Sequence, residues 1–267
     1  MLPFLDLKII KIPMYGLCIM IGIVLAALAA KFMVKRRNKD YMDFVIISAL
    51  IGGFAVIFAK LLFLLVSVPF KDLFKVLKNM IIHGDNSIFT SGYVFYGGVI
   101  GGVIGFFIGV KIAKCKVSDF VDFYAVLIPL IHAFGRIGCF CGGCCYGIPY
   151  DGPFSVVYNN PITSVPAGIG IFPVQLFESL LLFILSFVMY ILFIKDKKYL
   201  ILYYFISYGC IRFSTEFLRY DSERGSIFGI STSQFISIIA VIVSIAILIF
   251  IYFRTRKKGI ANKTALN

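Results

Sequence analysis

Apolar residues occur along the chain in long uninterrupted runs, not in the short alternating stretches that β-strands produce. Each run is close to the about 20 residues that a helix needs to cross ~30 Å of hydrocarbon. They predict seven transmembrane helices, near residues 13–34, 43–67, 91–111, 119–138, 173–194, 199–218 and 233–253. No polar stretch between them exceeds about 35 residues, which argues against a separate soluble domain. We therefore predict an all-α, polytopic fold in which residues 1–267 form a single integral-membrane domain.

Composition supports this interpretation. Hydrophobic residues make up 60% of the chain and the mean hydropathy is +0.97, while charged residues make up 15%, against about 25% in soluble domains. The net charge of +13 is accounted for by a basic protein face that meets anionic lipid. We therefore expect membrane lipid, and no nucleic acid, as a partner.

The lysines and arginines alternate between successive connections. The first, third and fifth connections and the C-terminal tail hold 16 of the 26 basic residues: Lys31, Lys35, Arg36, Arg37, Lys39, Lys111, Lys114, Lys116, Lys195, Lys197, Lys198, Arg254, Arg256, Lys257, Lys258 and Lys263. The N-terminus and the other connections hold seven: Lys8, Lys11, Lys71, Lys75, Lys78, Arg219 and Arg224. Cytoplasmic loops carry the excess of positive charge. We predict that the N-terminus lies outside and the C-terminus in the cytoplasm.

The end of the fourth run, HAFGRIGCFCGGCCYG at residues 132–147, carries unusual polar chemistry. His132, Arg136 and Cys139 are spaced to share one helical face. An arginine inside a span costs ~2.5–3.5 kcal/mol unless it has a partner or faces a wet cavity. Because the loop 139–172 holds no Lys or Arg, this stretch is expected at the outer surface.

Two further helices carry polar residues near the same end. In the sixth run, Tyr208, Arg212, Glu216 and Arg219 fall on one stripe, which holds more charge than a single structural ion pair requires. In the fifth run, Gln175 and Glu178 share one side of the outer end. Arginine offers a planar fork of donors that suits phosphate. The abundant anion at the outer leaflet is phospholipid phosphate, so this pattern predicts a phospholipid-handling cavity.

Four motifs, taken in order, resemble one known family: FYGGVIGG, GRIGCFCGGCCYG, FPVQLFES and YGCIRFSTEFLRYD. On seven helices, they look like the bacterial prolipoprotein diacylglyceryl transferases, over roughly residues 13–253. The resemblance implies an enzyme of lipoprotein biosynthesis in the bacterial cytoplasmic (inner) membrane, with its active site toward the outer leaflet. Such an enzyme moves diacylglyceryl from phosphatidylglycerol to the lipobox cysteine thiol at the signal peptide of a preprolipoprotein, and it needs no metal or organic cofactor.

The resemblance also implies roles for individual residues. Arg136 and Arg212 would hold the phosphate, and the polar groups around them would organise the site. We expect catalytic roles for Arg136, Arg212, Glu216 and Tyr96, and substrate-binding roles for Tyr208, Arg219, Glu178, Gln175, Gly97, Gly98, Cys139 and Cys144. Six glycines between 97 and 109, taken alone, favour helix packing over a site.

Three residues depart from the family pattern at positions that would supply the general base and two polar contacts. Tyr96 stands where the family usually has histidine, and Cys139 and Cys144 stand where it usually has asparagine and glutamate. A tyrosine with a pKa near 10 is a weak base. Nearby arginine charge could instead favour the acceptor thiolate.

The four cysteines at 139, 141, 144 and 145 leave several alternatives open. They could form disulfides, pack as small buried residues, or bind a metal, although no second cysteine pair follows them. A membrane thiol-redox protein is therefore an alternative function, as is a paralogue with a different acceptor. A transporter would call for an internal repeat, which the sequence does not show.

The alternation of basic connections predicts a topology that labelling can test. Tags inserted in the loop 139–172 should be accessible from outside the cell, and tags after residue 254 only from the cytoplasm, because the positive loops remain inside. The opposite labelling pattern would contradict the predicted orientation.

Overall fold

The computed structural model describes residues 4–6, 11–67, 71, 78, 92–159, 165–220, 225–227 and 229–264. Among the residues named above, Lys8, Lys75, Ser91 at the start of the third predicted span, and Arg224 lie outside this part of the chain. The described residues form two compact units, residues 31–120 and residues 1–30 with 121–267. The prediction of a single domain stays a prediction.

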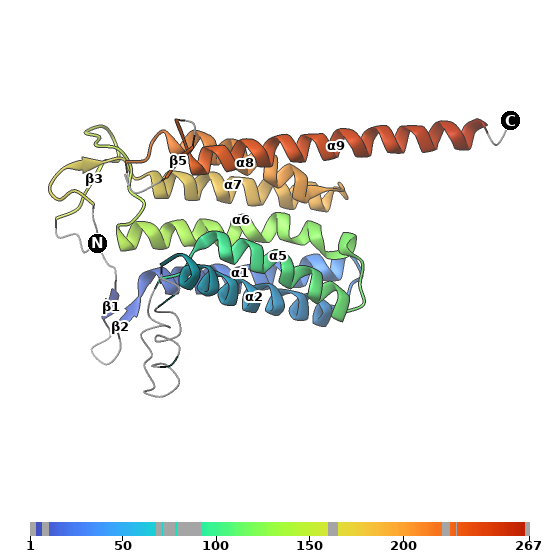
Figure 1. Ribbon diagram of the computed structural model, residues 1–267, viewed down its shortest axis with the longest axis horizontal. Coiled ribbons are helices and arrows are strands. Elements are labelled where there is room, and N and C mark those ends of the chain that lie inside the picture. Colours follow the sequence, from blue (N-terminus) through green and yellow to red (C-terminus); the bar gives the residue numbers. More distant parts are fainter. Residues whose placement is uncertain are drawn as a thin grey trace. The chain divides into compact units, whose positions relative to one another are not determined.

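The described part of the chain contains seven long helices: α1 (Met14–Arg36), α2 (Tyr41–Ser67), α5 (Phe95–Ile112), α6 (Val117–Gly142), α7 (Val174–Ile194), α8 (Leu200–Glu216) and α9 (Thr232–Thr264). Each predicted apolar run overlaps one of them, and several helices extend beyond the predicted bounds (Figure 1). All except α8 are long and apolar enough to cross a membrane. The helical class is thereby confirmed, and the crossing by α8 stays a prediction, because its 17 residues extend only about 26 Å.

Three short antiparallel ribbons accompany the helices, and the sequence patterns did not predict them. They pair β1 (Phe4–Asp6) with β2 (Lys11–Pro13), β3 (Val156–Val157) with β4 (Gly170–Ile171), and β5 (Ser226–Ile227) with β6 (Ile230–Ser231). Strands of two or three residues are too short to show an alternating pattern.

The unit formed by residues 31–120 is held together by close packing of α2 against α5. Gly97, Gly101, Gly105 and Gly109 lie one helical turn apart and are all buried. A methyl group at Gly101 would lie 2.7 Å from Phe58 Cβ, which is closer than van der Waals contact permits. The glycine run therefore packs two helices at short range, as small residues do in membrane proteins.

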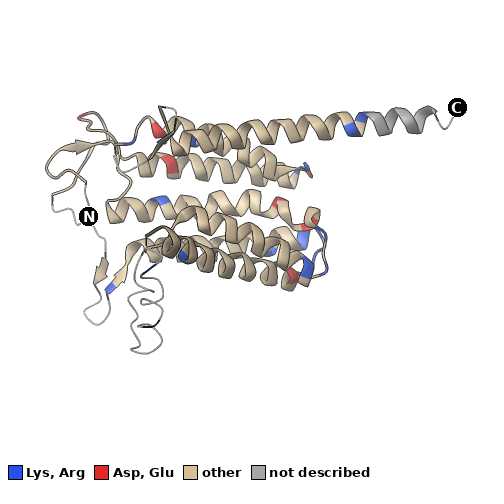
Figure 2. Cartoon of the chain, in the orientation of Figure 1, with Lys and Arg blue, Asp and Glu red and all other residues tan. Residues whose placement is uncertain are grey.

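Most of the described basic residues of this unit lie at one end of its helices (Figure 2). Lys39, between α1 and α2, forms a 3.0 Å ion pair with Asp119 at the start of α6. The Cys115 thiol, between α5 and α6, donates a hydrogen bond of 3.2 Å to Asp43 on α2. The two basic connections thus lie on the same side of this unit, as the predicted alternation requires.

In the other unit, side-chain hydrogen bonds tie α6 to α7. Ser179 Oγ and Ser186 Oγ, both on α7, donate to the carbonyl oxygens of Ala133 and Val126 on α6, each over 2.9 Å. Helix α8 packs against both of its neighbours in the sequence, α7 and α9 (Figure 1). These contacts bring the polar ends of α6, α7 and α8 to one place.

Matched glycine substitutions test the packing of α2 on α5. Gly101→Ala should lower the free energy of unfolding by about 1–3 kcal/mol, because the added methyl group overlaps the α2 backbone and Phe58. Gly102→Ala is the control, since its methyl group would lie 3.7 Å from Ile51 Cγ2, an ordinary contact. Thermal unfolding in detergent measures both, and equal stabilities would contradict the packing role.

Candidate functional site

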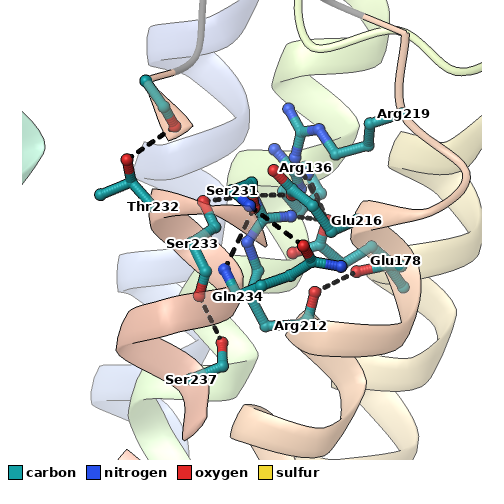
Figure 3. A network of polar contacts seen from close by, with 12 residues as sticks. Arg136, Glu178, Arg212, Glu216, Arg219, Ser231, Thr232, Ser233, Gln234 and Ser237 are labelled. Atoms are coloured by element: carbon teal, nitrogen blue, oxygen red, sulfur yellow. Dashed lines mark hydrogen bonds and ion pairs between the residues drawn. The ribbon is translucent and has the colours of Figure 1, made fainter. Parts of the chain in front are cut away.

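A buried carboxylate lies at the centre of the polar cluster. Glu178, in the second turn of α7, has an exposed fraction of 1%. Its Oε2 atom accepts a hydrogen bond from Arg136 Nη2 and lies 3.8 Å from Arg212 Nη1 and 3.7 Å from Arg219 Nη1 (Figure 3). One carboxylate is therefore the shared counter-charge of three guanidinium groups, which come from α6, α8 and the segment after α8.

A second carboxylate completes the cluster on α8. Glu216 Oε2 lies 2.6 Å from Arg212 Nη2, one helical turn away. The ion pair between Arg212 and Glu216 that the sequence suggested is therefore present, but Arg212 also lies beside Glu178. The three arginines and two glutamates leave one positive charge in excess.

Two nitrogen atoms of these arginines have unused hydrogen-bonding capacity. Within the described residues, Arg136 Nε and Arg212 Nη1 are buried and have no hydrogen-bond acceptor. An unsatisfied buried donor costs about 1–3 kcal/mol, and more when it is charged. Together with the excess positive charge, these donors make the cluster suited to an anion whose oxygens accept hydrogen bonds.

The segment that follows α8 positions Arg219. The sequence placed this arginine on the helical stripe with Arg212 and Glu216, but α8 ends at Glu216. The chain then pairs with residues 146–148 through hydrogen bonds from Ile148 N to Leu218 O (3.1 Å) and from Tyr220 N to Tyr146 O (3.2 Å). A methyl group at Gly147 would lie 2.9 Å from Leu218 O, so only glycine permits this close approach.

Helix α6 continues to Gly142, beyond the predicted end near residue 138, and its last turn carries Cys139 and Cys141. Gly143 adopts a φ of 70°, the left-handed conformation with which glycine commonly ends helices. The backbone amides of Gly143 and Cys144 donate to the carbonyl oxygens of Phe140 (3.2 Å) and Cys139 (3.1 Å). This is the Schellman arrangement, and it folds Cys144 back over Cys139.

The cysteine turn is joined to the charged cluster. Cys139 Sγ lies 3.9 Å from Arg136 Nη1, and Gln175 Nε2 on α7 donates to the Cys144 carbonyl oxygen over 2.9 Å. The thiol groups of Cys139, Cys144 and Cys145 all lie within 4.8 Å of one another.

The structure thus brings together most of the residues that the sequence singled out. Arg136, Glu178, Arg212, Glu216 and Arg219 form the charged cluster, and Gln175, Cys139 and Cys144 adjoin it. Tyr208 packs edge to face against His132, with ring centroids 5.3 Å apart. Their roles in binding or catalysis stay predictions.

Tyr96, Gly97 and Gly98 belong to the unit formed by residues 31–120. Gly97 is buried against α2, whereas Tyr96 is exposed on α5 and packs on Phe95. Gly97 therefore has a packing role that is independent of any substrate. The catalytic role of Tyr96 and the substrate-binding roles of the two glycines stay predictions.

The sequence interpretation missed Ser233. Its hydroxyl oxygen accepts a 3.0 Å hydrogen bond from Arg212 Nη2, so α9 helps to orient this guanidinium (Figure 3). A signal was present: Ser233 and Ser237 are one turn apart in a helix whose residues up to Phe253 are otherwise largely apolar. Ser237 Oγ donates to the Ser233 carbonyl oxygen over 2.8 Å.

Comparisons with known proteins identify relatives of nearly full length. A family model described as prolipoprotein diacylglyceryl transferase matches residues 3–250. The phosphatidylglycerol–prolipoprotein diacylglyceryl transferase of Clostridium tetani (strain Massachusetts / E88) is 35% identical over 253 residues, which cover 93% of this chain and 96% of the relative. A second relative is phosphatidylglycerol–prolipoprotein diacylglyceryl transferase 2 of Clostridium perfringens (strain 13 / Type A). It is 32% identical over 246 residues, which cover 87% of this chain and 88% of the relative.

The central position of Glu178 predicts a large effect on stability. Glu178→Gln should destabilise the protein by about 3–5 kcal/mol, because it leaves buried guanidinium groups without their shared counter-charge. Asp196→Asn makes the same chemical change at an exposed turn and should have little effect. Thermal unfolding in detergent compares the two, and equal melting temperatures would show that the cluster does not depend on Glu178.

Proposed function

The chain belongs to the prolipoprotein diacylglyceryl transferase family, and from this we propose that it is a transferase that moves diacylglyceryl from phosphatidylglycerol to a cysteine thiol. The acceptor is the lipobox cysteine of a preprolipoprotein. Two comparisons support the proposal: the family match over residues 3–250, and the similarity to the diacylglyceryl transferases of Clostridium tetani and Clostridium perfringens.

The observation that carries the proposal is the charge balance around Glu178. The ester phosphate of phosphatidylglycerol carries one negative charge, and the cluster has one positive charge in excess. The buried donors Arg136 Nε and Arg212 Nη1 are available to phosphate oxygens. Guanidinium suits this task because it stays charged in apolar surroundings and offers donors in a fixed plane.

The proposed reaction is a displacement at carbon. The acceptor thiol loses its proton, and the sulfur forms a bond to the glycerol carbon that carries the phosphate ester. The carbon–oxygen bond breaks, and its electron pair leaves with the phosphate oxygen as glycerol phosphate. The leaving phosphate gains one negative charge, which Arg136 and Arg212 stabilise as it develops.

In the proposed reaction the thiol proton passes to water, and the resemblance indicates why a strong protein base is missing. Tyr96 stands where the family usually has histidine, and a tyrosine is a weak base at neutral pH. An arginine-rich site compensates for this, because positive charge favours the thiolate that attacks. Cys139 and Cys144 would line the substrate site from the end of α6.

The proposed setting is the bacterial cytoplasmic membrane. Six helices of the described chain are able to span a bilayer, which supports a multi-pass membrane protein. The predicted orientation places the ends of α6 and α8 toward the outer leaflet, where phosphatidylglycerol enters sideways and secreted preprolipoproteins emerge. Nucleic acid has no part in this function.

Substitution of Arg136 tests the phosphate role. In phosphatidylglycerol vesicles with a synthetic lipobox peptide, Arg136→Gln should lower the transfer rate by at least ~10²-fold, comparable to the loss of one oxyanion donor. Cys141→Ser, on the same helix, is the control and should keep nearly the full rate. Mass spectrometry of the peptide measures the product. A folded Arg136→Gln protein with the control's rate would refute the phosphate role.

Cys139→Asn separates transfer from thiol-redox chemistry. The substitution restores the residue that the family usually carries, and an amide donates a stronger hydrogen bond than a thiol. The transfer rate should be unchanged or higher, in the same vesicle assay. Loss of all activity in Cys139→Asn, combined with an active Arg136→Gln variant, would favour the thiol-redox alternative.

A further inference from the structure

The end of α6 carries three thiol groups arranged as metal ligands. Cys139, Cys144 and Cys145 each offer one sulfur atom, and the three atoms lie within 4.8 Å of one another. Cys139 is buried, whereas Cys144 and Cys145 are partly exposed, so an ion could reach the cluster. We propose that these three cysteines bind a single thiophilic metal ion of the Zn²⁺, Cd²⁺ or Cu⁺ class.

Backbone geometry explains why three thiols meet here. The Schellman turn brings the residue after Gly143 back to the carbonyl of Cys139, and it is made by hydrogen bonds of 3.2 Å and 3.1 Å. Cys145 then adopts a φ of 58°, which is uncommon for a residue other than glycine, asparagine or aspartate. This conformation lets two consecutive thiols approach Cys139 together.

The dimensions suit a metal–thiolate centre. Zinc–sulfur bonds are about 2.3 Å long, so three sulfurs around one ion lie about 3.8–4.0 Å apart. The observed limit of 4.8 Å therefore requires the sulfurs to move by about an ångström or less, which side-chain rotation can supply. Three thiolates select soft and borderline ions over Mg²⁺ or Ca²⁺, which prefer oxygen ligands.

Cys141 does not belong to the cluster, although it lies in the same stretch. The sequence alone suggested that a zinc site would want a second, well-separated cysteine pair. The turn at Gly143 removes this requirement, because it gathers three ligands from one chain end. Water or a ligand from solution can complete the coordination.

The neighbouring charges favour the bound state. Three thiolates and one divalent ion carry a net charge of about −1 once three thiol protons have been released to solvent. Arg136 Nη1 lies 3.9 Å from Cys139 Sγ, and the cluster to which Arg136 belongs has one positive charge in excess. The metal–thiolate centre and the arginine cluster therefore neutralise each other.

Metal binding has a consequence that rests on the proposed function. The metal–thiolate centre and the lipid phosphate would both draw on the excess positive charge at Arg136. Zn²⁺ should therefore slow transfer in the wild-type protein and in Cys141→Ser, but not in Cys145→Ser, to which the family resemblance gives no role. Unchanged transfer in a wild-type protein that holds zinc would overturn this competition and leave the metal site standing.

Binding itself is tested by Cd²⁺ titration of the full-length, reduced protein in detergent. The wild-type protein and Cys141→Ser should bind one ion per chain, with the ultraviolet charge-transfer band of cadmium–thiolate bonds. Cys139→Ser, Cys144→Ser and Cys145→Ser should each weaken binding by at least ~10²-fold, the upper range for loss of a supporting contact at a metal site.

Two results would overturn the metal site. One is a cadmium–thiolate band that survives in all three serine variants, which would place the ion elsewhere. The other is a reduced wild-type protein that binds no ion while its peptide masses show only thiols. Both readouts are independent of transfer, so their failure is distinguishable from failure of the proposed function.

Discussion

The candidate site depends on one buried carboxylate. Glu178 lies among apolar helices, where an isolated charge of either sign would be costly. Its Oε2 atom lies within ion-pair distance of Arg136, Arg212 and Arg219, so α6, α8 and the segment after α8 converge on one atom of α7. The arginines can remain charged and buried because this counter-charge is present. The cluster still has one positive charge in excess, which can bind an anion.

Helix ends supply the remaining geometry. The glycine at 143 ends α6 and folds Cys144 back over Cys139, which lies beside Arg136. The pairing of residues 146–148 with residues 218–220 places Arg219 beside Glu178, although α8 has already ended. The charged side chains of the candidate site therefore meet near the ends of α6 and α8, where residues of several elements converge.

The sequence predicted the helices well because long apolar runs have one physical explanation in a bilayer. It also singled out the charged residues that the structure brings together, because a buried arginine in a span needs a partner or a ligand. It did not predict that Glu178 would be the shared centre, since spacing within one helix does not reveal which neighbouring helix it faces. Arg219 was placed on a helical stripe because the pattern could not show where α8 ends.

For the cysteine cluster, too, the sequence pattern could not predict which side chains meet. The spacing C-x-C-x-x-C-C left packing, disulfides and metal binding open, because the choice depends on where the side chains meet. The two glycines between Cys141 and Cys144 were a readable signal for a helix end. Only the turn geometry shows that Cys139, Cys144 and Cys145 converge and Cys141 does not.

The central claim is that the arginines around Glu178 hold the phosphate of phosphatidylglycerol. The most direct measurement is the equilibrium affinity of the detergent-solubilised protein for this lipid, compared between the wild type, Arg212→Lys and the control Arg254→Lys near the C-terminus. Lysine keeps the charge but loses the planar fork, so Arg212→Lys should bind at least ~10-fold more weakly, as expected for the loss of a charged hydrogen bond. The control should match the wild type. Equal affinities in all three proteins would contradict the claim.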